Sequence, residues 1–563
     1  MRVEAGQQLK SKGNTMSAAD QARPLSWGDT FFLYLEREGQ PLNIASTCEF
    51  EGKISKQACA KFVESKLHLI PRYKQRAVFP SFNLGLPTWE PDPHFDIRNH
   101  VHEVVLKQGT DSDLKEVAAK VISSRLDRNR PLWDITLVRG LKGDRTGMVF
   151  RIHHCMADGV SGVGVMNVLL DASPNPQKRL ASNSHPRTAR PTDSVVMLLD
   201  QFLKSYQSFT QGALTAQTEV LNVARELLTG AAQGHTEELM RLFPELVSVT
   251  ERFPFNQICR GPQRIAWGEL PMADIKAIRE RCGGTVNDVV LTLIASTVRR
   301  YAEKHGVNVR GRQLRLVVPV NLRGDGDLSE LGNKISFLPI SVPLDVRDPR
   351  RLLAWISERI VFLRSVGVPE MVGMFGMLVS KVPLPVQAVL VPLLTQLPLS
   401  LANMICTNVP GPQLPLYLLG HRLLRCYPYV PIGGLLGVNA AILSYDGVAY
   451  VGFGGDVFAV PDIDCFEEML RASFEEMRDA AERKPAPAKA IEKPARATAR
   501  PRPIPLTKAV ARTKAPKAKK DSVQAPASPK PRTAAAATIP LPAAVAAAAA
   551  VAAPKAPLAQ AGD

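Results

Sequence analysis

The stretch RIHHCMADGVSG, residues 151–162, places two adjacent histidines after the apolar residues 148–150. An apolar run that leads into a glycine-containing turn indicates a buried β-strand, here ending at the histidines. Side chains alternate between the two faces of a strand, so His153 and His154 are expected to point in opposite directions. Because histidine exchanges protons near neutral pH, the stretch predicts one catalytic histidine that faces an active-site channel.

The turn that follows contains the pair Asp158 and Gly159, which is typical of turns. Asp158 is therefore expected to orient the motif. Two other interpretations stay open, a metal site and a purely structural histidine pair. Neighbouring histidines on a strand do not give a metal the one-faced spacing of a zinc-binding helix, so a catalytic histidine is favoured and no metal is expected.

No side-chain nucleophile is arranged beside the histidines. A Gly-x-Ser-x-Gly sequence is absent around the motif, and Cys155 would point across the sheet from His154 if the strand continued. The simplest remaining chemistry has the histidine remove a proton from a hydroxyl or amine while that group attacks an activated acyl carbonyl.

Outward from the motif, strand-like and helix-like segments alternate, which indicates a mixed α/β (α+β) fold. Strands are expected at residues 42–52, 100–106, 315–322 and 337–344, and helices at 56–67, 114–126 and 195–213. Asp29 is expected to cap a short helix near the start of the fold. The expected domains are 24–180 and 264–483, joined by an exposed connector with helices at 181–263.

Both ends of the chain have compositions that do not support a core. From Arg483 onward there are 16 Lys and Arg against three Asp and Glu, which supplies +13 of the formal charge of +17. Residues 484–563 are therefore expected to be a disordered basic tail, and residues 1–23 a disordered start without a signal peptide. Met16 is a candidate alternative start. Eight scattered cysteines without a CxxC pair favour reduced thiols in a cytosolic protein.

Residues 382–404 are strongly apolar but contain four prolines. Each proline removes a backbone donor and clashes with the preceding helical turn, so a regular membrane-spanning helix is not expected. A buried connection and a surface that dips into a lipid interface both remain open.

Six further motifs accompany the histidine motif in a fixed order. They are LSWGDTFFLYLE (25–36), RPLWDITLV (130–138), TVNDVVL (285–291), PVNLR (319–323), LGNKISFLP (331–339) and TNVPGP (407–412). With these motifs the chain resembles the bacterial wax ester synthase and acyl-CoA:diacylglycerol acyltransferase family, within the chloramphenicol acetyltransferase-like superfamily. The resemblance implies two mixed-sheet domains joined by a helical connector, with an active-site channel at their interface.

The resemblance also implies roles for the residues of the histidine motif. His154 would be the general base, and His153 would support the site or shape the acceptor channel. Asp158 would hold the motif through an ion pair, and Gly159 would permit the turn.

Motifs outside the histidine stretch are implied to lie beside the same channel. Asn287 and Asp288 would lie near it, where the Asn287 amide could stabilise a developing oxyanion. A helix cap is the alternative for this pair, and the two roles are compatible. Pro131, Leu132 and Trp133 would pack beside the channel without taking part in chemistry.

These roles imply an acyl-CoA-dependent O-acyltransferase that esterifies diacylglycerol or long-chain alcohols, without an acyl-enzyme and with acyl-CoA as co-substrate in place of a cofactor. Two alternatives stay open. One is transfer to another acceptor, such as an amine, a polyketide or a glycolipid hydroxyl. The other is a non-catalytic lipid-binding or droplet-coating protein.

The basic tail suggests where the protein acts. Lysine and arginine near an anionic lipid surface favour attachment, so a cytoplasmic protein at the inner membrane face or on lipid droplets is expected, without a transmembrane span. A solvated linker is the alternative, and specific nucleic-acid binding is not expected.

Overall fold

The computed structural model describes residues 23–80, 86–156, 159–175, 242, 244–246, 248–321, 335–373 and 401–483. The chain divides into two compact units, Met1–Ala486 and Pro487–Asp563, and every described residue belongs to the first. The expected N-terminal segment, the helix at 195–213, the tail and most of the apolar segment 382–404 lie outside the described residues.

The first large sheet surrounds the histidine motif. Its strands are β2 (Asn43–Glu51), β5 (Val101–Val105), β6 (Trp133–Leu141), β7 (Arg145–His153), β12 (Tyr417–Leu418) and β13 (His421–Tyr429). They lie in the order β12-β13-β2-β7-β6-β5. β2 and β7 pair antiparallel along their whole lengths, from Asn43 opposite His153 to Glu51 opposite Arg145. The motif strand is therefore central in its sheet.

Helices and one small sheet complete this half. They are α1 (Trp27–Leu35), α2 (Lys56–Lys66), α3 (Asp111–Ser123), α4 (Gly159–Leu169), the 3-10 turns Leu67–Leu69, Pro71–Lys74 and Ile97–Asn99, and the strands β1 (Arg23–Pro24), β3 (Gln75–Val78) and β4 (Thr88–Pro91). The small sheet has the order β1-β4-β3. The cap of α1 corrects the prediction for Asp29. Ser26 is the cap, and its Oγ accepts the N–H of Asp29 at 3.1 Å, because a hydroxyl before the helix reaches the orphan N–H groups of the first turn.

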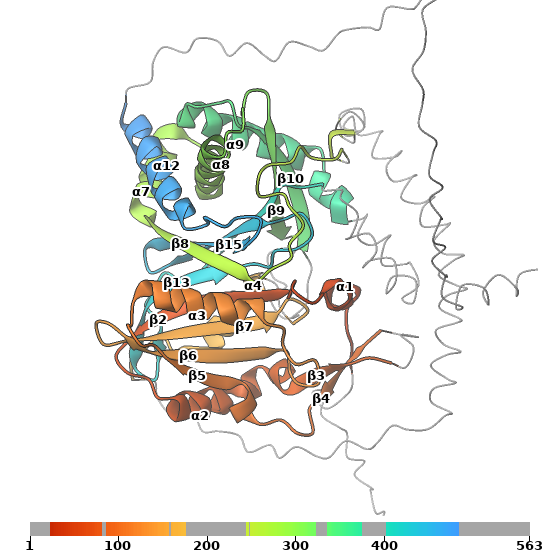
Figure 1. The fold of residues 1–563 in the computed structure, drawn as a ribbon, viewed down its shortest axis with the longest axis vertical. Coiled ribbons are helices and arrows are strands. Elements are labelled where there is room, and N and C mark those ends of the chain that lie inside the picture. Colours follow the sequence, from red (N-terminus) through yellow and green to blue (C-terminus); the bar gives the residue numbers. More distant parts are fainter. Residues whose placement is uncertain are drawn as a thin grey trace, which may run out of the picture. The chain divides into compact units, whose positions relative to one another are not determined.

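The second large sheet carries four helices on one face (Figure 1). Its strands are β8 (Gln263–Pro271), β9 (Gln313–Asn321), β10 (Ile335–Pro343), β11 (Met404–Pro410), β14 (Val438–Tyr445) and β15 (Val448–Asp456). The helices are α7 (Met272–Cys282), α8 (Val286–Lys304), α9 (Pro349–Ser365) and α12 (Cys465–Glu482). The strands lie in the order β10-β9-β11-β14-β15-β8. Most of α8 is buried, so this helix forms the centre of the second core.

The second half of the chain also supplies two strands to the first sheet. β13 pairs antiparallel with β2, and this register sets Cys426 opposite Cys48 with the two thiol sulfurs 3.1 Å apart. Helix α3 packs on β2, β6 and β7 of the first sheet and also on β8 of the second. These contacts join the two sheets directly. The expected α/β (α+β) class is confirmed, but the sequence does not predict the exchange of β12 and β13.

Candidate functional site

The two histidines lie where β7 ends. The strand stops at His153, one residue earlier than expected, and His154 begins the turn. Backbone bonds fix this end, since the N–H of His153 donates to Leu132 O at 2.9 Å and the N–H of His154 donates to Leu42 O at 2.8 Å. The His153 side chain is 1% exposed, whereas His154 is half-buried. Of the two histidines, His154 is therefore the one whose side chain a ligand could contact.

The ring of His154 is held by an aromatic partner from α1. Its centroid lies 3.8 Å from that of the Phe32 ring, and the two planes are 16° apart. Such close stacking fixes the imidazole plane. Phe32 belongs to the LSWGDTFFLYLE motif, so the first motif of the chain meets the histidine motif in space.

His153 has a different environment, which assigns its tautomer. Its Nδ1 accepts the N–H of Cys155 at 3.1 Å, so the proton of the neutral ring lies on Nε2. That nitrogen faces Glu36 Oε1 at 3.5 Å. With Nδ1 bonded, Nε2 beside a buried carboxylate and the ring itself buried, His153 is suited to supporting the turn.

Glu36 is a residue that the sequence reasoning missed. Its carboxylate is 1% exposed, and it accepts two bonds from Arg128, at 2.9 and 3.2 Å, and one from Leu42 N–H at 3.3 Å. Burial raises the pKa of this carboxyl, but His153 and Arg128 outweigh burial and lower it to about 2. Glu36 is therefore an anion that anchors His153. The available signal was its place as the last residue of the LSWGDTFFLYLE motif.

Replacing Glu36 with glutamine is expected to cost about 1.5–3 kcal/mol of unfolding free energy at pH 7, because a charged acceptor is lost from a buried network. In the unfolded chain this carboxyl titrates near 4.5, against about 2 when folded. Its charge therefore stabilises the fold above about pH 4.5, and the stabilisation is lost as the pH falls towards 2. Urea unfolding between pH 3 and pH 7 should show this loss in the wild type.

The matched control is Glu38→Gln, at an exposed position two residues away. The control should follow the wild-type pH dependence. A Glu36→Gln variant as stable as the control at pH 7 would contradict the anchoring role.

Cys155 lies in the turn directly after His154, in a place that disfavours the thiolate. Its side chain is 1% exposed, and burial raises the pKa of the thiol well above its usual value. The reactive form of cysteine is the thiolate. This environment disfavours Cys155 as a nucleophile.

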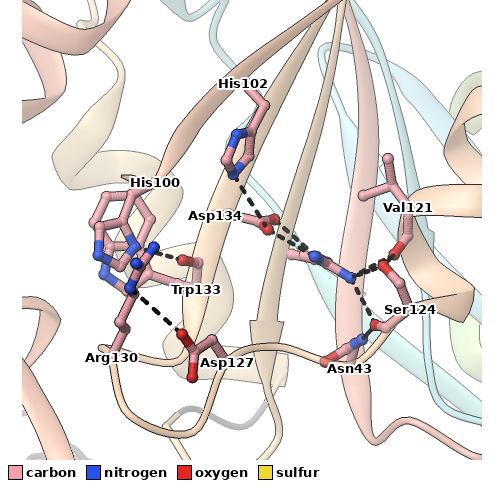
Figure 2. Close-up of polar contacts among 10 residues, drawn as sticks. Asn43, His100, His102, Val121, Ser124, Asp127, Arg130, Trp133 and Asp134 are labelled. Atoms are coloured by element: carbon pink, nitrogen blue, oxygen red, sulfur yellow. Dashed lines mark hydrogen bonds and ion pairs between the residues drawn. The ribbon is translucent and has the colours of Figure 1, made fainter. Parts of the chain in front are cut away.

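A buried ion pair at the start of the motif was also missed. Arg151 donates to both oxygens of Asp134, at 2.8 and 2.7 Å, and also to the backbone oxygens of Val121 and Ser124. Figure 2 labels these three partners. Arg151 thereby ties β7 to β6 and to the end of α3. The signal was a charged residue inside an apolar strand, which is rare unless the charge is paired.

Pro131, Leu132 and Trp133 are all buried. The Trp133 ring stacks on His100 at a centroid distance of 4.6 Å, and its Nε1 donates to Tyr73 O at 2.8 Å. The polar atom of the ring is thus satisfied within the core. Among the three residues, Leu132 reaches the histidines through its backbone oxygen, which favours packing as the role of this motif.

Asn287 and Asp288 lie in the first turn of α8. The cap of this helix is Thr285, in a capping box with Asp288, which corrects the prediction that the pair itself precedes the helix. The hydroxyl oxygen of Thr285 accepts the N–H of Asp288, and the Asp288 carboxylate accepts the N–H of Thr285. Ser357 Oγ donates to the same carboxylate at 2.9 Å. The Asp288 carboxylate therefore stabilises the start of α8 and its contact with α9.

Asn287 is paired with Asn408, which lies in β11. Asn408 Nδ2 donates to Asn287 Oδ1 at 3.2 Å, joining the TNVPGP and TVNDVVL motifs. Both amides line a cavity of about 840 Å³ whose walls include Val290, Val318 and Ile442. The cavity is mainly apolar, with these two amides among its polar groups.

The cavity lining does not include His153 or His154. Helix α4 begins at Gly159, within the histidine motif, and packs against β11, the strand of Asn408. Asp158 lies outside the described residues, so its ion pair stays a prediction.

Two further findings concern metal ions and membrane-spanning helices. Within the described ranges, no group of three or more His, Cys, Asp or Glu side chains is placed to hold a metal ion. In the same part of the chain, no helix is both long and apolar enough to cross a membrane.

Comparison with known proteins agrees with the motif order. Residues 25–290 match the model of the wax ester synthase/diacylglycerol acyltransferase catalytic domain, and residues 331–478 match the C-terminal domain of the same family. A probable diacylglycerol O-acyltransferase of Mycobacterium tuberculosis is 30% identical over 428 residues, which are 75% of this chain and 88% of the relative.

Solved structures show the same fold. The wax ester synthase/diacylglycerol acyltransferase from Marinobacter aquaeolei VT8 superposes with a TM-score of 0.56 at 23% identity, covering 82% of this chain and all of that one. The first condensation domain of the CDA synthetase gives 0.51 at 15% identity, over 82% and 97% of the two chains. These structural likenesses concern the fold alone.

Proposed function

The chain belongs to the wax ester synthase/diacylglycerol acyltransferase family, and from this premise we propose that it transfers a fatty acyl group from acyl-CoA to the hydroxyl of diacylglycerol or of a long-chain alcohol. One observation carries the proposal. The half-exposed His154 is held by the Phe32 ring at the end of a central strand, while its neighbour His153 is buried against Glu36.

In the proposed mechanism His154 is the general base. It takes the proton of the acceptor hydroxyl as that oxygen attacks the thioester carbonyl, and the bond from carbon to sulfur then breaks. The CoA thiolate leaves and takes the proton back from the imidazolium, so the histidine is regenerated. The neutral, buried Cys155 supports direct transfer without an acyl-enzyme.

The cavity beside α8 is the proposed place for a hydrocarbon chain. Its volume of about 840 Å³ and the apolar part of its lining, which also contains Lys276, Arg364 and Glu370, suit this role, since each buried methylene contributes about 0.8 kcal/mol. The carbonyl oxygen of Asn287 is engaged by Asn408, which leaves the NH₂ group of Asn287 as the proposed donor to the developing oxyanion.

Other expectations remain proposals. Residues 24–180 and 264–483 are the proposed halves of the enzyme, and Asp158 is proposed to orient the motif. The basic tail is proposed to bring the protein to the inner membrane face or to lipid droplets, because its lysines and arginines would be attracted to anionic lipid.

The proposed activity is tested by CoA release from palmitoyl-CoA, with hexadecanol or dioleoylglycerol as acceptor. We expect release that depends on the acceptor, and the ratio of the two rates ranks wax ester against triacylglycerol synthesis. An apolar cavity separates chains that differ by a methylene by only about 1–3 kcal/mol, so both acceptors should react. Absence of release with both would reject this acceptor class and favour another acceptor or a lipid-binding role.

A further inference from the structure

A second cavity, of about 500 Å³, lies outside the surroundings of His154 described above. It is lined by Tyr34, Arg76, Ala77, Val78, Phe79, Arg128 and Asn129. Tyr34 comes from α1, Arg76 to Val78 from β3, and Arg128 and Asn129 from the segment between α3 and β6. Three separate pieces of the first half thus line this open hollow.

Two polar atoms of this lining are buried without a hydrogen-bond partner, Tyr34 Oη and Arg76 Nε. Buried polar groups in native proteins are nearly always satisfied, so each exception needs an explanation. Both atoms belong to residues that line the same cavity. Both atoms are covered in this structure, so a ligand that accepts hydrogen bonds would satisfy them once the two side chains turn towards it.

The charge of the cavity is positive. Arg76 forms no ion pair with any carboxylate of the described residues. Glu90 lies opposite it in the β3–β4 ladder, but this carboxylate accepts the hydroxyl of Thr88 at 2.9 Å. Arg128 is partly neutralised by Glu36. Arg76 and Arg128 both line the hollow. Arg128 already donates through Nε and Nη2 to Glu36 and Leu33 O, so Arg76 is the main attraction for an anion.

The remaining walls are apolar. Phe79 meets the Tyr34 ring edge to face at a centroid distance of 6.1 Å, and Ala77 and Val78 complete this side. A small inorganic ion would leave these groups without a partner. The walls therefore suit an anionic group that is attached to an apolar or aromatic body.

The cavity is on the other side of α1 from the catalytic histidine. Residues two apart on a helix are rotated by about 200°, so Tyr34 and Phe32 face in nearly opposite directions. Phe32 is the residue that stacks on His154. The cavity and the surroundings of His154 therefore lie against different faces of α1.

We propose that this cavity binds a phosphate or carboxylate group carried on an apolar or aromatic body, with Arg76 and Arg128 as its cationic partners and Tyr34 as a hydroxyl donor. Arg128 also holds Glu36, which faces His153. A bound anion and the anchor of His153 thus share one guanidinium, which couples the two sites. The proposal does not depend on the acyl acceptor.

Isothermal titration calorimetry on the full chain tests the proposal with two probes. Adenosine 3′,5′-bisphosphate carries phosphates on an aromatic body, and dodecanoate, used below its micelle concentration, carries a carboxylate on an apolar one. We expect at least one probe to bind with one-to-one stoichiometry. Its Kd should rise about tenfold or more in Arg76→Gln, because a charged hydrogen-bond partner is lost. A smaller rise is expected in Tyr34→Phe, which keeps the ring.

The matched control is Arg98→Gln, which removes the same charge from an arginine whose side chain is 83% exposed and outside the cavity lining. Its Kd should equal that of the wild type. Thermal unfolding by circular dichroism confirms that each variant folds, and Tyr34→Phe provides a second variant if Arg76→Gln does not. The probe that binds identifies the anion class. No binding of either probe at millimolar concentration, or equal weakening in Arg98→Gln, would overturn the proposal.

Discussion

Replacing His154 with alanine is expected to lower acceptor-dependent CoA release by about 100- to 10,000-fold, the usual contribution of a general base. The loss should appear in kcat, since the imidazole acts on the proton that moves during attack. The fold should persist, because the side chain is half-buried in a turn and the backbone bond of its N–H to Leu42 O does not need the imidazole.

The control for this prediction is His94→Ala, at an exposed histidine in a loop of the same half. It should leave CoA release unchanged. His153→Ala serves as a further comparison, since this ring is buried against Glu36 and its loss should reduce stability as well as rate. A His154→Ala variant within tenfold of the wild-type rate would reject His154 as the base.

Replacing Arg151 with methionine should destabilise the fold by about 3–5 kcal/mol, the cost of leaving a buried charge without its partner. The guanidinium fills a site enclosed by Asp134, Val121 and Ser124 (Figure 2). Methionine would fill much of the volume. Among the described residues, the Asp134 carboxylate would then keep His102, at 3.9 Å, as its one ionisable partner. Urea unfolding at pH 7 measures the difference.

The double variant Arg151→Met with Asp134→Leu separates charge from packing. Replacing both members of a buried pair with apolar residues is often near neutral, so the double variant should recover much of the lost stability. Equal destabilisation of single and double variants would show that packing around the guanidinium dominates. A single variant as stable as the wild type would contradict the role of the ion pair.

Local sequence signals predicted the elements well where a pattern was complete within the element. The strand at residues 42–52 is β2, and the helices at 56–67 and 114–126 are α2 and α3. The caps of α1 and α8 lie two to three residues before the predicted positions, because Ser26 and Thr285, not Asp29 and Asp288, cap these helices. Asp29 and Asp288 are each the third residue of their helix, where an acidic side chain favours the helix N-terminus. The Ser or Thr before the helix is the cap.

The sequence by itself determined the strand that ends at the histidines, the mixed α/β class and the family, because each depends on residues close together or on the order of motifs. Only the tertiary structure decided that Phe32 stacks on His154, that Glu36 anchors His153, that Asn408 pairs with Asn287 and that β13 crosses into the first sheet. Periodicity reports which face of an element is buried but not which distant element covers it. These contacts join residues that are distant in the chain, so their partners follow from the packing of the two sheets.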